Sequence, residues 1–132
     1  MRAKEINLKP LVGSQCSHVS LGYFSIWLSF ARDESSVGSI RIECPYELRA
    51  ASGELLESKD ASVNEKENTR LGALLMAKIV SFEFSIPVGL SEVSDRFVLR
   101  FENGLSLAVI EGDDLESAVI DYENAEPKTQ VI

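Results

Sequence analysis

Residues 96–109, RFVLRFENGLSLAV, carry the clearest structural signal in this chain of 132 residues. Every second residue is apolar on both sides of Asn103-Gly104, first from Phe97 and then from Leu105. This period of two is typical of a β-strand with one buried face. Asn and Gly both tolerate the positive φ of a type I′ turn. The stretch therefore predicts two antiparallel strands joined by a tight hairpin.

The same alternation recurs through most of the chain. It predicts four strands in the first half, at residues 12–21, 23–31, 37–44 and 47–51, with a longer loop from Asp33 to Ser36. It predicts four more at 78–86, 96–102, 105–110 and 116–122. Both sets carry a Leu-x-Phe near the end of their second strand. An internal repeat of about 65 residues would explain this similarity, and so would chance likeness between runs of hairpins.

One segment between the two sets has a different pattern. Ser62 and Glu65 have the spacing of a helix capping box, and Leu71, Leu74 and Leu75 follow at helical spacing. We expect a helix over about 63–77, a loop before it from 53, and a frayed tail over 123–132. The predicted fold is mainly β (α+β): a single domain, 1–132, of two related antiparallel β-meander halves. These form a sandwich or partly open barrel, with the helix covering an edge or end.

Composition excludes several classes of protein. The chain is 45% hydrophobic and 26% charged, which is typical of a globular domain. No apolar run approaches the roughly 20 residues of a membrane span. We expect a cytoplasmic protein, a monomer or weak dimer, in which Cys16 and Cys44 are free thiols in the core. A Cys16–Cys44 disulfide in a secreted protein is the alternative.

No catalytic or metal site is visible. His18 is the only histidine, and we expect it on the polar side of its strand with Cys16 two residues away, about 7 Å between Cβ atoms and too far for a thiolate–imidazole contact. Metal-ligand spacings and glycine-rich phosphate loops are absent. We expect no enzyme and no cofactor. A net charge of −8 also disfavours nucleic acid and membrane surfaces.

The acidic charge is concentrated near the C-terminus. Residues 1–90 hold 11 acids and 10 bases, and residues 91–132 hold 10 acids and 3 bases, so the second segment carries −7 of the −8. An acidic face attracts a basic partner, although a solvated edge that resists strand pairing is the alternative. The acidic residues predicted to bind a partner are Glu111, Asp113, Asp114, Glu116, Asp121 and Glu123.

Tyr23 and Trp27 form a second candidate site. They fall on the outward face of a strand whose other face is already apolar, from Phe24 to Phe30. Such a strand is central and covered on both sides, for instance by the helix. Alternatively, Tyr23 and Trp27 form an exposed aromatic anchor for a partner.

Five segments together resemble a family of small bacterial immunity-type proteins of unassigned function, found beside polymorphic toxins and contact-dependent growth-inhibition loci. They are LGYFSIWLSF (21–30), ELRAASGE (47–54), LLMAKIV (74–80), LRFENGLSL (99–107) and ESAVI (116–120). The chain departs from the pattern at 75–77, where Leu-Leu-Gly is expected, and at Leu115, where an aromatic is expected. No site residues carry over from the family.

The resemblance implies an immunity protein that binds and neutralises a cognate toxin. Such a toxin would be basic if it is a nuclease, because it must bind phosphates, and an acidic surface could cover its cleft. The alternative function is a small-ligand-binding β-barrel. Its apolar cavity would be lined by Phe24, Leu28, Phe82, Phe84 and Phe101.

Overall fold

The computed structural model describes residues 8–61, 69–85, 96–110, 118–122 and 129–131, and these contain ten strands in two antiparallel sheets. Sheet A has the order β1 (Gln15–Leu21), β2 (Ile26–Arg32), β3 (Ser35–Ile42), β9 (Ala118–Tyr122), β10 (Thr129–Val131). Sheet B has the order β5 (Leu55–Asp60), β4 (Pro45–Arg49), β8 (Ser106–Ile110), β7 (Arg96–Phe101), β6 (Ile79–Ser85). Short 3-10 helices lie at η2 (Lys9–Leu11) and η3 (Leu71–Leu74).

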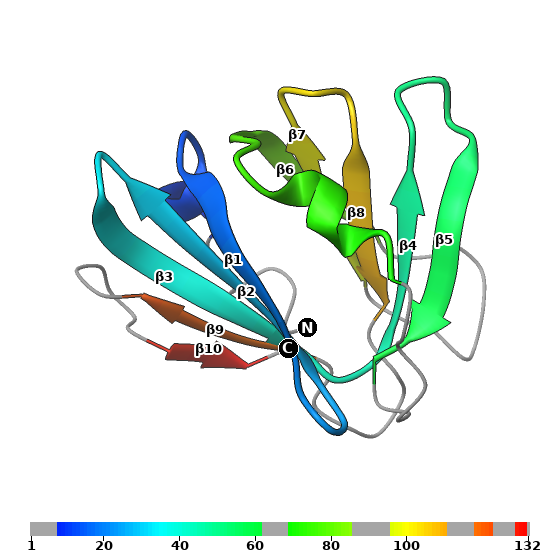
Figure 1. Cartoon of the computed structure of the whole chain (residues 1–132), viewed down its shortest axis with the longest axis horizontal. Helices are drawn as coiled ribbons and strands as arrows, with labels where there is room; N and C mark the ends of the chain where they lie inside the picture. Colours follow the sequence, from blue (N-terminus) through cyan, green and yellow to red (C-terminus); the bar gives the residue numbers. More distant parts are fainter. Residues whose placement is uncertain (1–7, 62–68, 86–95, 111–117, 123–128, 132) are drawn as a thin grey trace.

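The two sheets face each other as layers, and they are not closed into a barrel (Figure 1). The prediction of a mainly β, antiparallel fold is therefore confirmed, and of the two architectures left open the sandwich is the one observed. Side chains from both inner faces fill the space between the layers. The fully buried ones include Ile26, Leu28, Phe30, Ile40 and Ile42 from sheet A, and Tyr46, Leu48, Phe97, Leu99 and Leu107 from sheet B.

Each half of the chain contributes to both sheets. Strands β1 to β3 build one side of sheet A, and the next two strands, β4 and β5, cross over to extend sheet B beside β8. In the second half, β6 to β8 build sheet B, while β9 and β10 cross back to extend sheet A beside β3. In each half, the first three strands form one sheet and the last two strands join the other sheet. This shared arrangement favours an internal repeat over chance similarity.

Backbone hydrogen bonds join the sheets where β1 and β6 begin. Gln15 and Lys78 form an antiparallel bridge. Around it, the amide of Ile79 donates to the Ser14 carbonyl at 2.9 Å, and the amide of Cys16 donates to the Ala77 carbonyl at 3.0 Å. The first strands of the two halves are thus paired at their starting ends, which fixes how the two layers meet.

The helix prediction is wrong for the residues that the structure describes. Within 69–77 only the four-residue η3 is helical, and residues 62–68 lie outside the described part of the chain. The backbone turns extended at Leu75 (ψ 135°) and left-handed at Met76 (φ 69°), which ends the helix. The helical spacing of Leu71 and Leu74 is satisfied by one 3-10 turn that buries both side chains.

Two segments predicted without regular structure contain strands. Residues 55–60 were predicted to be a loop but form β5. The strand was missed because the polar Glu57 occupies an inward position, which hides the alternation of apolar residues. Residues 129–131, placed in a frayed tail, form β10 at the edge of sheet A, whereas 123–128 lie outside the described residues. Both strands are edges, where side-chain patterns are weakest.

The hairpin turns also differ from prediction. At Asn103-Gly104 only the glycine has a positive φ (+91°), and the Phe101 amide donates to the Leu105 carbonyl, so this is a three-residue loop with a glycine bulge. The two-residue turn is instead at Asp33-Glu34, between the paired Arg32 and Ser35. Both turn residues have positive φ (52° and 67°), as a type I′ turn requires.

Candidate functional site

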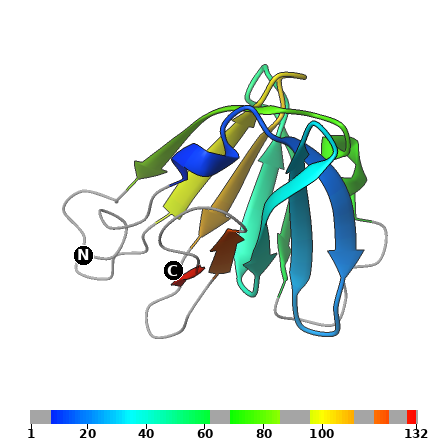
Figure 2. The ribbon, with the colours of Figure 1, turned by 90° about the vertical axis from the view of Figure 1, so that its left-hand side faces the viewer.

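The loop between β1 and β2 exposes an apolar cluster at the end of sheet A. Its side chains are those of Leu21, Tyr23 and Phe24, which we call the aromatic tip; they are 47%, 68% and 54% exposed. The Tyr23 and Phe24 rings contact each other, with centroids 4.5 Å apart. The loop projects beyond the strands it joins (Figures 1 and 2). Three large apolar side chains exposed within four residues make this end of the sheet a candidate interaction surface.

A tight turn creates the aromatic tip. The Gly22 amide donates to the Ser25 carbonyl at 2.8 Å, and a Cβ added at Gly22 would lie 2.7 Å from the Ser25 hydroxyl. The predicted strand over 23–31 therefore begins only at Ile26. Phe24, predicted on the buried face with Ile26, is exposed, because this turn takes it out of the strand.

Trp27 lies in β2, on the outward face of sheet A as its alternation with Ile26 and Leu28 predicted. It is half-buried, and it pairs with Ser20 on one side and Arg41 on the other. The Arg41 guanidinium lies over its ring, 5.1 Å from the centroid. Among the described residues it is this arginine, and not the expected helix, that covers Trp27. Tyr23 lies before β2 begins and belongs to the aromatic tip.

Strand register places Asp121 on the same sheet. Asp121 of β9 pairs with Ser39, while Val119 pairs with Arg41, so position 121 belongs to the same row of alternating positions as 39 and 41. The other predicted acidic residues, Glu111, Asp113, Asp114, Glu116 and Glu123, lie outside the described residues. The strand that follows the acidic segment begins at Ala118, and Ala118 pairs with Ile42. Ile42 in turn pairs with Ile26, the first residue of β2, next to the aromatic tip.

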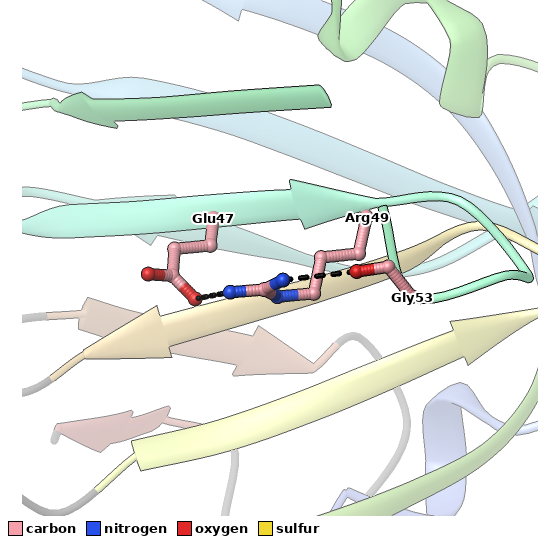
Figure 3. A network of polar contacts seen from close by, with 3 residues as sticks. All are labelled: Glu47, Arg49 and Gly53. Atoms are coloured by element: carbon pink, nitrogen blue, oxygen red, sulfur yellow. Dashed lines mark hydrogen bonds and ion pairs between the residues drawn. The ribbon is translucent and has the colours of Figure 1, made fainter. Parts of the chain in front are cut away.

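Two arginines on the outer faces of the sheets have different surroundings. Arg49 of β4 donates to the Gly53 carbonyl at 2.9 Å and to the Glu47 carboxylate at 3.2 Å (Figure 3). Arg41 of β3 also has a glutamate two residues away, but Glu43 is 3.7 Å distant and accepts no hydrogen bond from it. The Arg41 Nε is buried without an acceptor. Sequence reasoning missed Arg41; its register opposite Trp27 was the available signal.

Glu57 forms a polar cluster inside the sandwich. Its carboxylate accepts hydrogen bonds from the Tyr46 hydroxyl at 2.6 Å, the Arg70 amide at 2.6 Å and the Thr69 hydroxyl. Burial pushes the pKa of Glu57 upward, but these hydrogen bonds outweigh it and hold the pKa below its ordinary value. Burial raises the pKa of Tyr46 well above its usual range, so its hydroxyl stays a donor. Every oxygen is used within the protein, which makes this a structural cluster.

The cysteines and the histidine show no catalytic arrangement. Cys16 and Cys44 are buried thiols that are not joined in a disulfide, as expected, and burial raises the pKa of Cys16 to about 11. A β-bulge between Cys16 and His18 turns Cys16 into the core, so these two side chains do not share a face as predicted; His18 is exposed. Among the residues described here, no three potential metal ligands cluster together. None of the described helices is long and apolar enough to cross a membrane.

Of the residues proposed to line an apolar cavity, Phe24 lies outside the core, Phe82 packs against the core, and the side chain of Phe84 lies outside the described part. Phe24 belongs to the aromatic tip, while Leu28 and Phe101 are packed in the core. A hollow of about 250 Å³ lies at the sheet junction, and its walls are mostly polar: Gly13, Gln15, Ala31, Arg32, Asp33, Glu34 and Lys78. Binding of a small ligand stays a prediction, with Phe24 removed from its lining.

Comparison of the chain with protein-family models, with curated proteins and with solved structures finds no match. The surface described above is therefore the feature of the molecule that bears on its function. That surface comprises the aromatic tip, the Trp27–Arg41 pair on the outer face of sheet A, and the row that holds Asp121.

Proposed function

We propose that this protein binds another protein, with the aromatic tip as its anchor. The observation that carries the proposal is the exposure of Leu21, at the end of β1, together with Tyr23 and Phe24 of the loop that follows. Aromatic side chains at the centre of an interface contribute much of its binding energy, because they bury a large area at a low entropic cost. The solvent exposure of such a loop in the free protein is unfavourable, so a partner that covers it gains binding energy.

The partner we propose is a basic bacterial toxin, which would make the protein an immunity protein. Two features support this choice: the net charge of −8, and the entry of the chain into sheet A at Ala118, directly after the acidic residues 111–117 and at the tip end of β2. An acidic surface speeds association with a basic partner and makes it sensitive to salt. The resemblance to immunity-type proteins agrees with this function.

The test uses the toxin-like domain that this proposal expects to be encoded beside the gene. Co-expression of the wild-type protein should prevent growth arrest by that domain, and the purified pair should bind with an affinity that falls as salt is raised. The double variant Tyr23→Ser/Phe24→Ser should lose at least thirtyfold in affinity, or about 2 kcal/mol, as expected for an anchor. Its salt dependence should be unchanged, because no charge is removed.

Val80→Ser is the matched control. Val80 is 53% exposed, and it lies in β6 of the other sheet. This variant should bind like wild type, and all three proteins should have the same circular dichroism. A neighbouring gene without a toxin-like domain, or equal loss of binding in both variants, would contradict the proposal.

A further inference from the structure

Arg41 occupies the middle of the outer face of sheet A, between β2 and β9. Trp27 pairs with it on one side and Val119 on the other. The indole holds the guanidinium by a cation–π contact, 5.1 Å from the ring centroid, and the arginine side chain remains 34% exposed. The guanidinium is thus held against an aromatic ring, while the side chain as a whole stays partly exposed to solvent.

Arg41 differs in its hydrogen bonding from the other arginines of the described chain. The other arginines whose side chains are described, Arg32, Arg49, Arg70 and Arg100, each donate at least one hydrogen bond. Arg41 donates none to a described residue, and its Nε is buried without an acceptor. The 3.7 Å separation from the Glu43 carboxylate exceeds the roughly 2.7–3.2 Å of an N–H···O hydrogen bond. A ligand that binds the guanidinium therefore displaces no hydrogen bond to the residues that the structure describes.

We propose that the Trp27–Arg41 pair binds a carboxylate group of the partner protein. The planar guanidinium offers parallel N–H donors whose spacing matches the two oxygens of a carboxylate. A phosphate dianion fits less well, because the pair supplies one positive charge, has Glu43 beside it, and belongs to a chain with a net charge of −8. A carboxylate carries a single charge and needs only one arginine. Basic proteins also display Asp and Glu, so this contact is compatible with a basic partner.

Glu43 acts as an internal competitor in this arrangement. Its carboxylate lies close enough to attract the guanidinium but does not bond to it. An incoming carboxylate must overcome repulsion from Glu43 and then gains the bidentate contact that Glu43 does not make. Removal of the Glu43 charge should therefore strengthen ligand binding, whereas removal of Arg41 should abolish it. A purely structural role for the Arg41–Glu43 pair would not give these opposite effects.

The experiment is a titration with the acetylated and amidated tetrapeptide Glu-Glu-Glu-Glu, with its Gln-Gln-Gln-Gln analogue as the neutral control. Trp27 is the only tryptophan of the chain, so its fluorescence and its indole N–H resonance report on this site alone. We expect a saturable change with the acidic peptide and none with the neutral one. Arg41→Gln should weaken the response at least tenfold, and Glu43→Gln should strengthen it severalfold.

Arg49→Gln is the matched control, because Arg49 also has a glutamate two residues away but already uses its donors. This variant should respond like wild type. The proposal is overturned if wild type gives no saturable response, if Arg41→Gln responds like wild type, or if inorganic phosphate binds more tightly than the peptide. If Arg41→Gln does not fold, the titration of Glu43→Gln tests the proposal. A peptide affinity equal to that of wild type in this variant also overturns the proposal.

The source of the carboxylate rests on the proposed function, but the titration uses no toxin. Loss of toxin binding only in the aromatic-tip variant would support the role of the tip. The carboxylate site at the Trp27–Arg41 pair would then be tested by the peptide titration alone. A positive titration with no toxin bound would reject the proposed function and retain the site.

Discussion

Glu57 is the one carboxylate that the described part of the chain buries, at 7% exposure. Three donors surround it, from Tyr46, Thr69 and Arg70, and together they attach the start of η3 to strand β5. Hydrogen bonds to a charged group stabilise more than neutral ones. The ionised carboxylate therefore contributes to stability in a way that pH can remove.

We predict that Glu57→Gln lowers the free energy of unfolding by about 2 kcal/mol at pH 7, because charge-assisted hydrogen bonds are lost. The folded-state pKa of Glu57 is lowered, so its contribution is present above the unfolded pKa of about 4.3 and is lost as pH falls through the folded pKa. The difference between wild type and variant should thus shrink below about pH 4. Urea unfolding between pH 2.5 and 7 measures it.

Glu47→Gln serves as the control for this series. Glu47 lies on the same sheet, but its carboxylate is partly exposed and bonds only to Arg49 among the described contacts. This variant should change stability by less than about 1 kcal/mol, as is usual for surface pairs. A Glu57→Gln protein with the stability of wild type at pH 7 would show that the cluster contributes nothing.

At the scale of elements, two hairpins of sheet B each depend on a glycine in the left-handed region. Gly53 has a φ of +92° in the β4–β5 turn, and Gly104 has a φ of +91° in the β7–β8 turn. The two turns are neighbours, since a Cβ added at Gly104 would lie 3.0 Å from the Cβ of Ala51. Asn103 attaches the second turn to η3, through a hydrogen bond to the Ala73 carbonyl at 3.2 Å.

We predict a graded series for glycine-to-alanine changes. Gly53→Ala should cost about 1 kcal/mol of unfolding free energy, because an L side chain is strained at positive φ, while no atom lies within 4 Å of the added methyl group. Gly104→Ala should cost more, because contact with Ala51 adds to the same strain. Thermal or urea unfolding of the two variants measures the difference.

Gly72→Ala in η3 provides the reference for this series. Gly72 has neither a positive φ nor a close neighbour. The substitution should therefore be neutral or should stabilise the protein by about 0.5 kcal/mol, because alanine lowers the conformational entropy of the unfolded chain. Equal costs at Gly53 and Gly104 would mean that the turn around Ala51 moves aside freely. A large cost at Gly72 would mean that η3 is more tightly packed than the structure shows.

At the scale of the whole molecule, the exchange of strands makes the two halves interdependent. Sheet A needs β9 and β10 from the second half, and sheet B needs β4 and β5 from the first. The β1–β6 junction adds backbone hydrogen bonds between the first strands of the halves. Neither half can bury its inner face without the other, so we expect them to unfold together.

A change in sheet B tests this cooperativity. Leu48 of β4 is fully buried, and Leu48→Ala should destabilise the protein by about 3 kcal/mol. Trp27 in sheet A should report the same lowered urea midpoint as far-ultraviolet circular dichroism, which sees both sheets. If the Trp27 transition stayed at the wild-type midpoint while circular dichroism shifted, the sheets would unfold independently.

The alternation of apolar residues was sufficient to predict most strands and their antiparallel pairing. Ile40 and Ile42, or Phe97 and Leu99, face the core as their spacing indicated. The outward position of Trp27 followed from the same rule. This succeeds because a strand buried on one face imposes a period of two, and the hydrophobic effect enforces it along each strand.

Positions governed by distant contacts could not be predicted from local sequence. Strand β5 was missed because a charged residue, Glu57, occupies an inward position. That position is possible only because Thr69 and Arg70, more than ten residues away, donate hydrogen bonds to the carboxylate. Phe24 looked like a core residue, and only the Gly22–Ser25 turn places it in the aromatic tip. Arg41 became a candidate only when strand register placed it over Trp27.

The sequence by itself determined that this is a mainly β protein with antiparallel strands and an acidic C-terminal region, because alternation and composition are local properties. Only the tertiary structure decided which strands share a sheet, since hydrophobic patterns do not encode the partner of an edge. It also decided that the aromatic tip lies beyond the core and that Arg41 lies over Trp27 without a hydrogen bond to a described residue. These features depend on turn geometry and cross-strand register, which join residues far apart in the chain.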